Sequence, residues 1–361
     1  MQTTQRLILG DARRLDAIPD ASVQLVVTSP PYPMIAMWDD AFEAMDPQVG
    51  PLLAAEAGLA AFEAMHRCLD QVWAECARVL SPGGFAAINI GDATRSLGGQ
   101  FRLFHNHARI LCAMVELGFT VLPDVLWRKP TNAPNKFMGS GMLPAGAYVT
   151  YEHEYVLLFR QGGKRSFTSA AAKAARSRSA YFWEERNRWF SDVWSDLRGT
   201  RQQLGERADR ERSGAFPFEL PFRLINMLSL YGDTVLDPFA GTGTTLAAAA
   251  VAGRSSLGME LSEGFAPVAM ASVEAALAQG VEVQGERLEA HRRFLAERTQ
   301  AGKACKHHNT PHDLPVITGQ ERQLELLAPQ GWERADPLSI VVEHVNVERA
   351  KPRPVGQLAL L

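Results

Sequence analysis

Residues 234–245 read TVLDPFAGTGTT. An apolar strand ending at Asp237 runs into a turn that contains Gly241 and Gly243, and an alanine-rich helix follows over 243–252. Glycine lets a backbone approach a ligand closely, and the first turn of a helix presents unpaired N–H groups. This segment therefore predicts a ligand-binding turn in an α/β sheet.

The surroundings of the turn favour a nucleoside ligand without a pyrophosphate. No Gly-Lys-Ser/Thr follows, as a Walker loop requires, and Leu246 stands where a dinucleotide fingerprint has its third glycine. Glu260 ends the next predicted strand, at a spacing that suits a carboxylate bound to ribose hydroxyls. S-adenosylmethionine (SAM) has a ribose and an adenine but no phosphate, so it fits. A plain strand–helix turn is the alternative.

A second constellation, Ser29-Pro30-Pro31-Tyr32, directly follows the predicted strand 23–28. The prolines remove two N–H donors but keep their carbonyl acceptors, at the end of the strand where open α/β sheets bind ligands. Together with the Ser29 hydroxyl and the Tyr32 ring, these acceptors suit a planar group that bears an NH2. The alternative is a proline turn with a surface serine and tyrosine.

Elsewhere, short buried strands alternate with helices, which predicts a mostly parallel sheet covered by helices on both faces. We expect strands at 6–9, 23–28, 85–90, 119–127, 153–159, 234–237 and 255–261, and helices at 59–80, 101–117, 219–231, 243–252 and 263–278.

Composition limits the class of protein. The chain has 361 residues, 46% of them hydrophobic and 21% charged, which excludes global disorder and a fibrous repeat. No apolar run approaches the roughly 20 residues of a membrane span, and the first residues lack a signal-peptide core. The four cysteines show no CxxC spacing, which favours a reducing cytoplasm and no disulfide framework.

Residues 160–215 break the alternation of strands and helices and are rich in aromatic side chains, which indicates an inserted recognition region. The net charge of the chain is −3, yet residues 160–178 contain no acid. This stretch is interpreted as a phosphate-contacting surface or, alternatively, as a solvated loop. Its cations are Arg160, Lys164, Arg165, Lys173, Arg176 and Arg178.

The two motifs together resemble those of the amino-group DNA methyltransferases, which methylate N4 of cytosine or N6 of adenine. The catalytic motif [DNS]PP[YFW] is matched by Ser29 to Tyr32, and the SAM motif FxGxGT by Phe239, Gly241, Gly243 and Thr244. The resemblance covers about residues 6–280. Because the catalytic motif comes first, the chain is similar to the permuted beta group. Methyltransferases that act on glutamine side chains or ribosomal RNA often carry NPP[YF] after the SAM motif. The motif order and Ser29 both disfavour such an enzyme here.

The resemblance implies a Rossmann-like SAM-dependent methyltransferase fold with circularly permuted motif order. It divides the chain into a catalytic half (1–159), a target-recognition region (160–215) and a SAM-binding half (216–300). Residues 301–361 are polar and punctuated by prolines, which predicts a loosely structured tail. The resemblance also implies a cofactor role for four residues: Asp11 at the adenine amine, Phe216 around the methionine part, Asp237 near the methionine amine and Glu260 at the ribose.

The implied activity is site-specific transfer of a methyl group from SAM to N4 of cytosine in duplex DNA, with the target base flipped out of the helix. In the family, serine at the first motif position tends to accompany N4-cytosine. Hydrogen bonds from the amine to Ser29 and Pro30 would activate its nitrogen, and Tyr32 would stack on the base. With no Pro-Cys dipeptide, a C5-cytosine route has no candidate nucleophile. The alternatives are N6-adenine methylation and an inactive DNA-binding protein.

Double-stranded DNA is therefore the expected partner, and a palindrome such as CTAG is a guess at the recognition site. Homodimers are frequent in this family. Two peptides, Gln323–Leu327 and Gln357–Leu361, resemble the QLxL[FL] sequences that dock on sliding clamps. Cys305, His307, His308 and His312 match no common zinc-site spacing, so no metal site is predicted.

Overall fold

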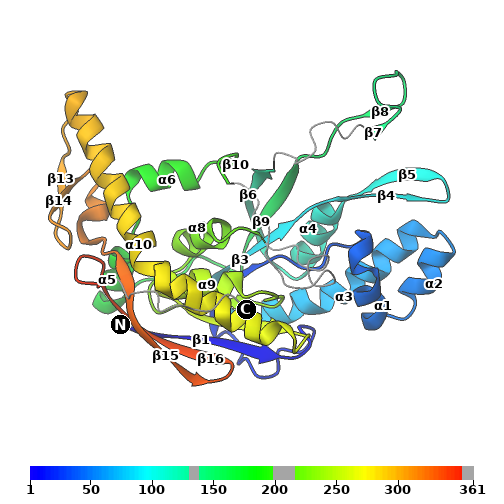
Figure 1. The fold of residues 1–361 in the computed structure, drawn as a ribbon, viewed down its shortest axis with the longest axis horizontal. Helices are drawn as coiled ribbons and strands as arrows, with labels where there is room; N and C mark the ends of the chain where they lie inside the picture. The colour runs from blue at the N-terminus through cyan, green and yellow to red at the C-terminus, as the bar shows by residue number, and fades with distance from the viewer. Residues whose placement is uncertain (130–137, 198–215, 352–361) are drawn as a thin grey trace.

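A ten-stranded sheet forms the centre of the computed structural model, which describes residues 1–129, 138–197 and 216–351 (Figure 1). The strand order is β10-β6-β9-β3-β2-β11-β12-β1-β16-β15. The strands are β1 (Gln2–Leu9), β2 (Val23–Thr28), β3 (Leu80–Ile90), β6 (Thr120–Arg128), β9 (His153–Arg160), β10 (Val193–Trp194), β11 (Thr234–Asp237), β12 (Ser255–Glu260), β15 (Leu327–Asp336) and β16 (Ser339–Asn346).

The five central strands β3, β2, β11, β12 and β1 are parallel, which confirms the predicted α/β class. Strand β9 runs antiparallel between β3 and β6. The motif strands β2 and β11 are neighbours although about 200 residues separate them. Their carboxyl ends therefore lie at the same edge of the sheet.

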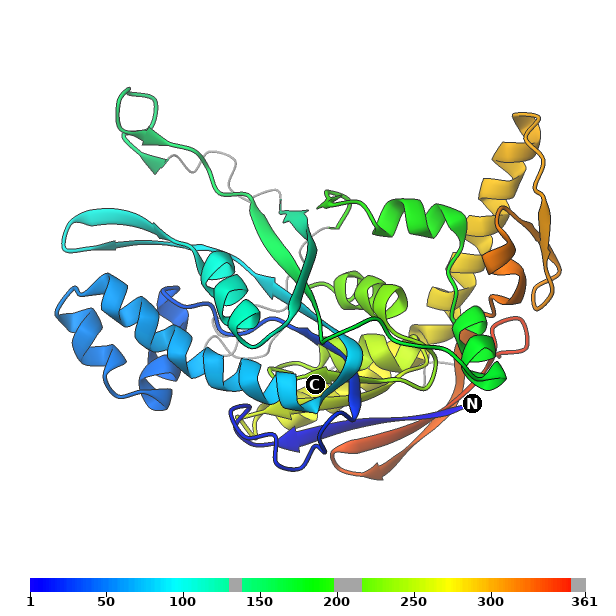
Figure 2. The ribbon, with the colours of Figure 1, turned by 180° about the vertical axis from the view of Figure 1, so that it is seen from behind.

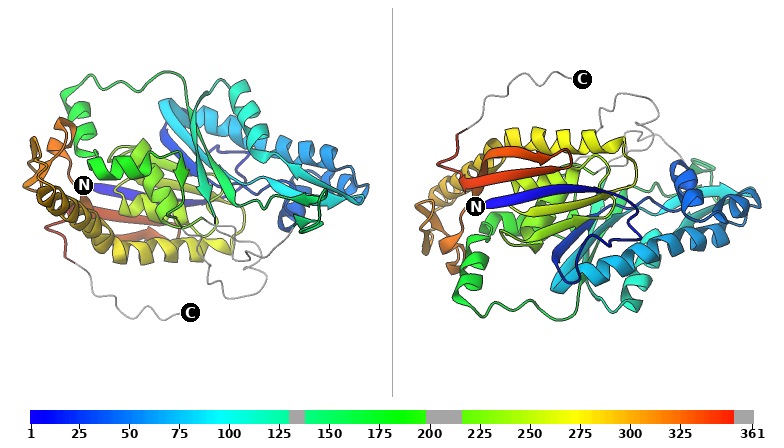
Figure 3. Two further views of the ribbon diagram at one scale, coloured as in Figure 1. Left: turned by 90° about the horizontal axis from the view of Figure 1, so that it is seen from above. Right: turned by 90° about the horizontal axis from the view of Figure 1, so that it is seen from below.

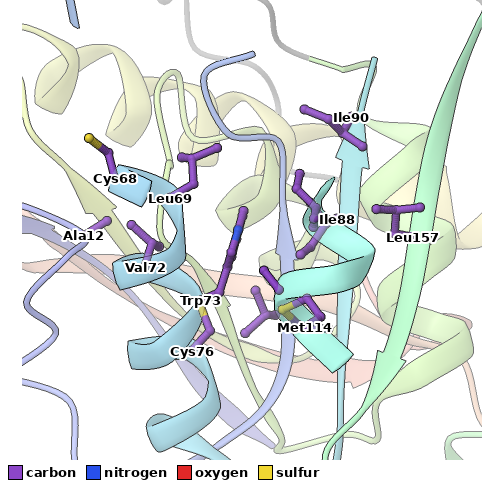
Figure 4. Close-up of a cluster of buried hydrophobic side chains, with 14 of the residues drawn as sticks. Ala12, Cys68, Leu69, Val72, Trp73, Cys76, Ile88, Ile90, Met114 and Leu157 are labelled. Atoms are coloured by element: carbon purple, nitrogen blue, oxygen red, sulfur yellow. The ribbon is translucent and has the colours of Figure 1, made fainter. Parts of the chain in front are cut away.

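Helices cover both faces of the sheet, because alternate residues of each strand point to opposite sides (Figure 2). Val26 packs with α3 (Gly58–Val79) and α4 (Asn106–Glu116). Leu25 and Val27 pack with α8 (Glu219–Leu228) and α9 (Thr244–Val251). Helix α10 (Phe265–Gln300) packs beside α9. Figure 4 shows the α3 side, where Trp73 is fully buried near Ile88 of β3.

Two hairpins project from the same side of the sheet (Figure 1). The first is formed by β4 (Ala93–Leu97) and β5 (Gln100–Phe104), and the second by β7 (Met138–Gly139) and β8 (Ala147–Tyr148). Phe101 and Tyr148 stack at 5.0 Å and hold the hairpins together. The predicted helix 101–117 is therefore wrong in its first turn: residues 100–104 are a strand, and the helix starts at Asn106.

The remaining elements are short. They are η1 (Ala36–Trp38), α1 (Asp39–Met45), α2 (Val49–Ala54), α5 (Ala170–Arg178), α6 (Trp183–Trp189), β13 (His307–Asn309), β14 (Leu314–Val316) and η2 (Gly319–Gln323). Helices α5 and α6 and strand β10 lie in the region 160–215, which was interpreted as an inserted recognition region. Among the described residues, no helix is long and apolar enough to cross a membrane.

The prediction of a loosely structured tail after residue 300 is wrong as far as residue 351. Strand β16 pairs antiparallel with β1, and β15 then forms the edge of the central sheet (Figure 3, right). Ile340 and Val342 of β16 are fully buried against α10 and Leu7. These residues complete the core, so their order follows from apolar burial. The sequence around them is polar and punctuated by prolines, so these buried residues were not predicted to be part of a strand.

Candidate active site

A cavity of about 950 Å³ lies at the carboxyl ends of the parallel strands. Both sequence motifs line it, since Ser29 to Tyr32 follow β2 and the glycine turn follows β11. Eleven predicted residues share this lining: Asp11, Ser29, Pro30, Pro31, Tyr32, Phe216, Asp237, Phe239, Gly241, Thr244 and Glu260. The fold thus brings together the two constellations that the sequence separates.

Asp237 is a buried carboxylate held by neutral donors. The Thr28 hydroxyl donates to its Oδ1 at 2.6 Å, and the Thr245 hydroxyl donates to its Oδ2 at 2.6 Å. The backbone N–H of Phe239 donates to Oδ1 at 3.0 Å. Burial raises the pKa of Asp237 to about 6, although these hydrogen bonds oppose the shift. The carboxylate is still mostly ionised at neutral pH, and its charge favours a cationic ligand in the cavity.

Glu260 is fixed by the backbone at the end of β12. The N–H of Gly241 donates to its Oε2 at 2.9 Å, and the N–H of Ser262 donates to its Oε1 at 2.9 Å. A carboxylate has about four acceptor sites, so these two bonds leave capacity for the hydroxyls of a ribose. The donor set therefore fits the nucleoside that the spacing predicted.

The two glycines of the turn have different surroundings. Gly241 (φ +49°) lines the cavity, and a Cβ there would have no neighbour nearer than Phe239 O at 3.9 Å. Gly243 (φ +79°) does not line the cavity; a Cβ there would meet the carbonyl oxygen of Ala269 in α10 at 2.8 Å. The motif includes Gly243 among the cofactor-binding residues, whereas the structure places it against Ala269 of α10 and outside the cavity lining. This glycine allows α9 to pack against α10.

Asp11, after β1, forms an ion pair with Arg13, a residue that was not predicted from the sequence. The Arg13 guanidinium donates to both carboxylate oxygens, with Nη2 at 2.6 Å from Oδ2, and lowers the pKa of Asp11. Both side chains line the cavity. The acid to which the resemblance assigns the adenine amine thus stands here as an Asp11–Arg13 pair. The backbone N–H of Arg13 also donates to Asp11 Oδ1, at 2.9 Å.

The serine and tyrosine of the second motif belong to a side-chain network. Ser29 Oγ donates to Tyr32 Oη at 3.1 Å, and Tyr32 Oη donates to Glu154 Oε2 at 2.9 Å. Asn89 Nδ2 donates to both Tyr32 Oη and Glu154 Oε2. Lys129 Nζ lies 2.5 Å from Glu154 Oε1. Asn89, Lys129 and Glu154 were not predicted from the sequence, although polar residues at the ends of the apolar strands β3, β6 and β9 were a usable signal.

A family model described as DNA methylase, for N6 and N4 methyltransferases, matches residues 23–271. The chain belongs to this N6/N4 DNA methylase family. It is 45% identical over 335 residues to the type II methyltransferase M.MthZI of Methanothermobacter thermautotrophicus, covering 92% of this chain and 93% of that protein. It is 47% identical over 277 residues to the type II methyltransferase M.MjaI of Methanocaldococcus jannaschii, covering 74% and 90%.

A solved structure agrees with this membership. TTHA0409, a Thermus thermophilus protein assigned as a DNA modification methylase, was crystallised in complex with SAM. It is 36% identical to this chain, with a TM-score of 0.59, covering 75% of this chain and 95% of that one. The predicted SAM-dependent amino-methyltransferase of DNA is thus confirmed as a class, with SAM as the cofactor.

The basic stretch of this methylase lies at the opposite edge of the sheet from the cavity. Strand β9 is antiparallel to β3, so Arg160 ends it beside Thr120, where β6 begins. The Arg165 guanidinium pairs with Asp233, just before β11, at 2.6 Å, and Arg178 pairs with Glu325 at 2.9 Å. Lys164, Lys173 and Arg176 are exposed or half-buried in the same segment. Its position does not support the expected contact with DNA at the cavity.

Two further expectations concern the carboxyl-terminal region. Leu324 and Leu326 are fully buried, so Gln323–Leu327 is not available to dock on a sliding clamp, and that prediction is wrong for this copy. Gln357–Leu361 lies outside the described residues. His312 is buried between Glu348 and the N–H of Leu326. The described part of the chain contains no group of three or more residues able to hold a metal ion.

Proposed function

We propose that this methylase transfers a methyl group from SAM to N4 of cytosine in duplex DNA. The observation that carries the proposal is Ser29, a neutral acceptor in the cavity wall at the end of β2, where N6-adenine members of the family tend to have aspartate. The Pro30 carbonyl and the Tyr32 ring lie in the same wall. Together they form a set of acceptors and an aromatic surface for one planar base with an amino group.

The cofactor half of the cavity suits SAM. When bound, SAM supplies an electrophilic methyl group. Glu260 would accept hydrogen bonds from the ribose, and the buried charge of Asp237 would attract the ammonium group of the methionine part. Asp11 would take the adenine amine. Phe216, Phe239, Gly241 and Thr244 line the space between them.

The amine half supplies orientation. The exocyclic nitrogen of cytosine is a weak nucleophile, because its lone pair is delocalised into the ring. Ser29 Oγ and the Pro30 carbonyl accept its two hydrogens and turn the nitrogen toward tetrahedral geometry, so that its lone pair faces the methyl group. After transfer, the nitrogen loses one proton to solvent. Most of the rate enhancement comes from holding the two reactants in line.

The DNA lies, in this proposal, across the edge of the sheet that carries the cavity. Both hairpins start at the cavity rim, since Gly91 and Asp92 precede β4 and His153 and Glu154 follow β8. Lys129 also lines the cavity. Met142 and Val149, in and beside the β7–β8 hairpin, are 83% and 88% exposed. Apolar side chains at such a position suit the gap left by a flipped base.

The test is the identity of the product. Purified enzyme, SAM and a library of duplex DNA are incubated, and the digested nucleosides are resolved by mass spectrometry. We expect N4-methylcytosine, and we expect no transfer by the Ser29→Ala variant above about a tenth of the wild-type rate. N6-methyladenine as the sole product would overturn the cytosine assignment. SAM binding without any methylated base would favour an inactive DNA-binding protein.

A further inference from the structure

The Ser29–Tyr32–Glu154 chain has a direction that follows from counting protons. A carboxylate has only acceptors, so the single hydroxyl proton of Tyr32 goes to Glu154 Oε2, 2.9 Å away. Tyr32 Oη then has nothing left to donate, and the contact with Ser29 at 3.1 Å must be donated by Ser29. The only proton of the Ser29 hydroxyl is thereby directed at Tyr32. Its lone pairs remain for a ligand in the cavity.

The surroundings hold this direction in place. Asn89 Nδ2 donates to Tyr32 Oη at 2.8 Å and to Glu154 Oε2 at 2.7 Å, so it can only reinforce both as acceptors. Lys129 occupies the other carboxylate oxygen. Burial raises the pKa of Tyr32, which keeps its hydroxyl protonated. A Cβ at Gly91 would meet Tyr32 Cε2 at 3.0 Å and Glu154 Cγ at 3.3 Å, so the glycine allows the two side chains to meet.

We propose that Glu154 is a positioning residue that makes Ser29 an obligatory hydrogen-bond acceptor, and so selects a substrate amine over a carbonyl. A serine hydroxyl can by itself either donate or accept a hydrogen bond. Its proton could therefore equally well bind an oxygen on the edge of a base. Because the Ser29 proton binds Tyr32, Ser29 stabilises only a hydrogen-bond donor such as NH2. The inference rests on the proposed function, in that an amine is the group methylated.

The variant Glu154→Gln changes the direction while it keeps the shape. The amide has one oxygen and one NH2, and Lys129 Nζ, at 2.5 Å from Oε1, attracts the oxygen. The NH2 then faces Tyr32 and donates to it. Tyr32 loses its carboxylate acceptor, so its proton is no longer held away from Ser29, and the Ser29 proton is free to turn into the cavity. That proton would oppose the substrate amine.

The measurement is steady-state methylation of duplex DNA with the SAM affinity determined separately by calorimetry. For Glu154→Gln we expect kcat to fall about 10- to 100-fold, the range of one hydrogen bond to a charged group. The SAM affinity should change by less than about threefold, because Glu154 binds Tyr32, Asn89 and Lys129 and none of the residues assigned to the cofactor. Glu63→Gln is the matched control: it makes the same chemical change to a carboxylate paired with Arg109, outside the cavity, and should retain wild-type kcat.

Tyr32→Phe decides whether Glu154 acts through Tyr32. This variant keeps the ring and removes the hydroxyl, so kcat should fall while SAM still binds. In the double variant, Glu154→Gln should lower kcat by no more than about twofold further, because the link to Ser29 is already absent. Wild-type kcat in either single variant, or losses that multiply in the double variant, would overturn the proposal. If the wild type yields N6-methyladenine, only the cytosine assignment fails, since adenine N6 is also an amine.

Discussion

The two edges of the central sheet differ: beside the ion pairs Asp11–Arg13 and Lys129–Glu154, the carboxyl edge keeps two carboxylates without a counter-ion. At the carboxyl edge, Asp237 and Glu260 are held by hydroxyls and backbone N–H groups, and neither forms an ion pair among the described residues. At the amino edge, Arg165 and Arg178 are each neutralised by an acid. Charge kept without a counter-ion is available to a ligand, whereas a neutralised charge contributes mainly to packing. The basic stretch, conspicuous in the sequence, lies at the amino edge because β9 runs antiparallel to β3.

The largest expected effect is at Asp237. Asp237→Ala removes the charge that attracts the cofactor and leaves the Thr28 and Thr245 hydroxyls without their acceptor. We expect the SAM affinity to fall about 100-fold, measured by calorimetry. Asp233→Ala is the control at the amino edge: it frees Arg165 and should lower stability while SAM affinity stays unchanged. Equal losses of SAM affinity in both variants would remove the distinction between the edges.

A smaller effect concerns pH. The pKa of Asp237 is about 6 in the folded protein against an ordinary 3.8, so the folded state holds this proton more tightly than the unfolded state does. Ionisation therefore costs stability as pH rises from about 4 to above 6. Relative to Asp237→Asn, the wild type should gain about 1 kcal/mol in unfolding free energy when pH falls from 7 to 5. Urea denaturation of both proteins without SAM gives this difference. A constant difference across that range would mean that the carboxylate is not desolvated.

The smallest expected effect is at the amino edge. Replacing Arg165 and Arg178 by alanine should leave unchanged the slope of log DNA affinity against log salt, because neither side chain faces the bound duplex. Lys129→Ala, at the carboxyl edge, should lower that slope by about one unit if the lysine leaves Glu154 to contact a phosphate when DNA binds. DNA binding measured at several salt concentrations provides both values. A reduced slope for the two arginine variants would mean that the basic stretch contacts DNA phosphates.

The sequence motifs were sufficient to locate the cavity, because strand ends and turns are local features. Ser29 and Asp237 were each recognisable within a few residues, and parallel pairing brought them to one edge. The network behind Ser29 was not recognisable in this way. Glu154 reaches Tyr32 across 122 residues, and nothing in the local pattern indicates which strand will lie beside β3.

Strand direction and packing between distant segments explain where the structure departs from the sequence-based expectations. The cations after β9 were assigned to DNA because they cluster in sequence, but the antiparallel strand carries them away from the cavity. Gly243 fits a ligand-binding motif, yet its constraint comes from Ala269 in a later helix. The tail was judged by its polar composition, while its buried residues find their partners in β1.

The place of β1 has a consequence for the newly made chain. This first strand lies between β12 and β16, and Arg6 pairs with both Leu257 and Ser339. At a synthesis rate of about 5–20 residues per second, β1 waits roughly 15 s to a minute for its second neighbour to leave the ribosome. During that time both of its edges are initially open to other chains. The alternate buried side chains of Gln2–Leu9 include Thr3 and Gln5, and these polar residues reduce its tendency to aggregate while it waits.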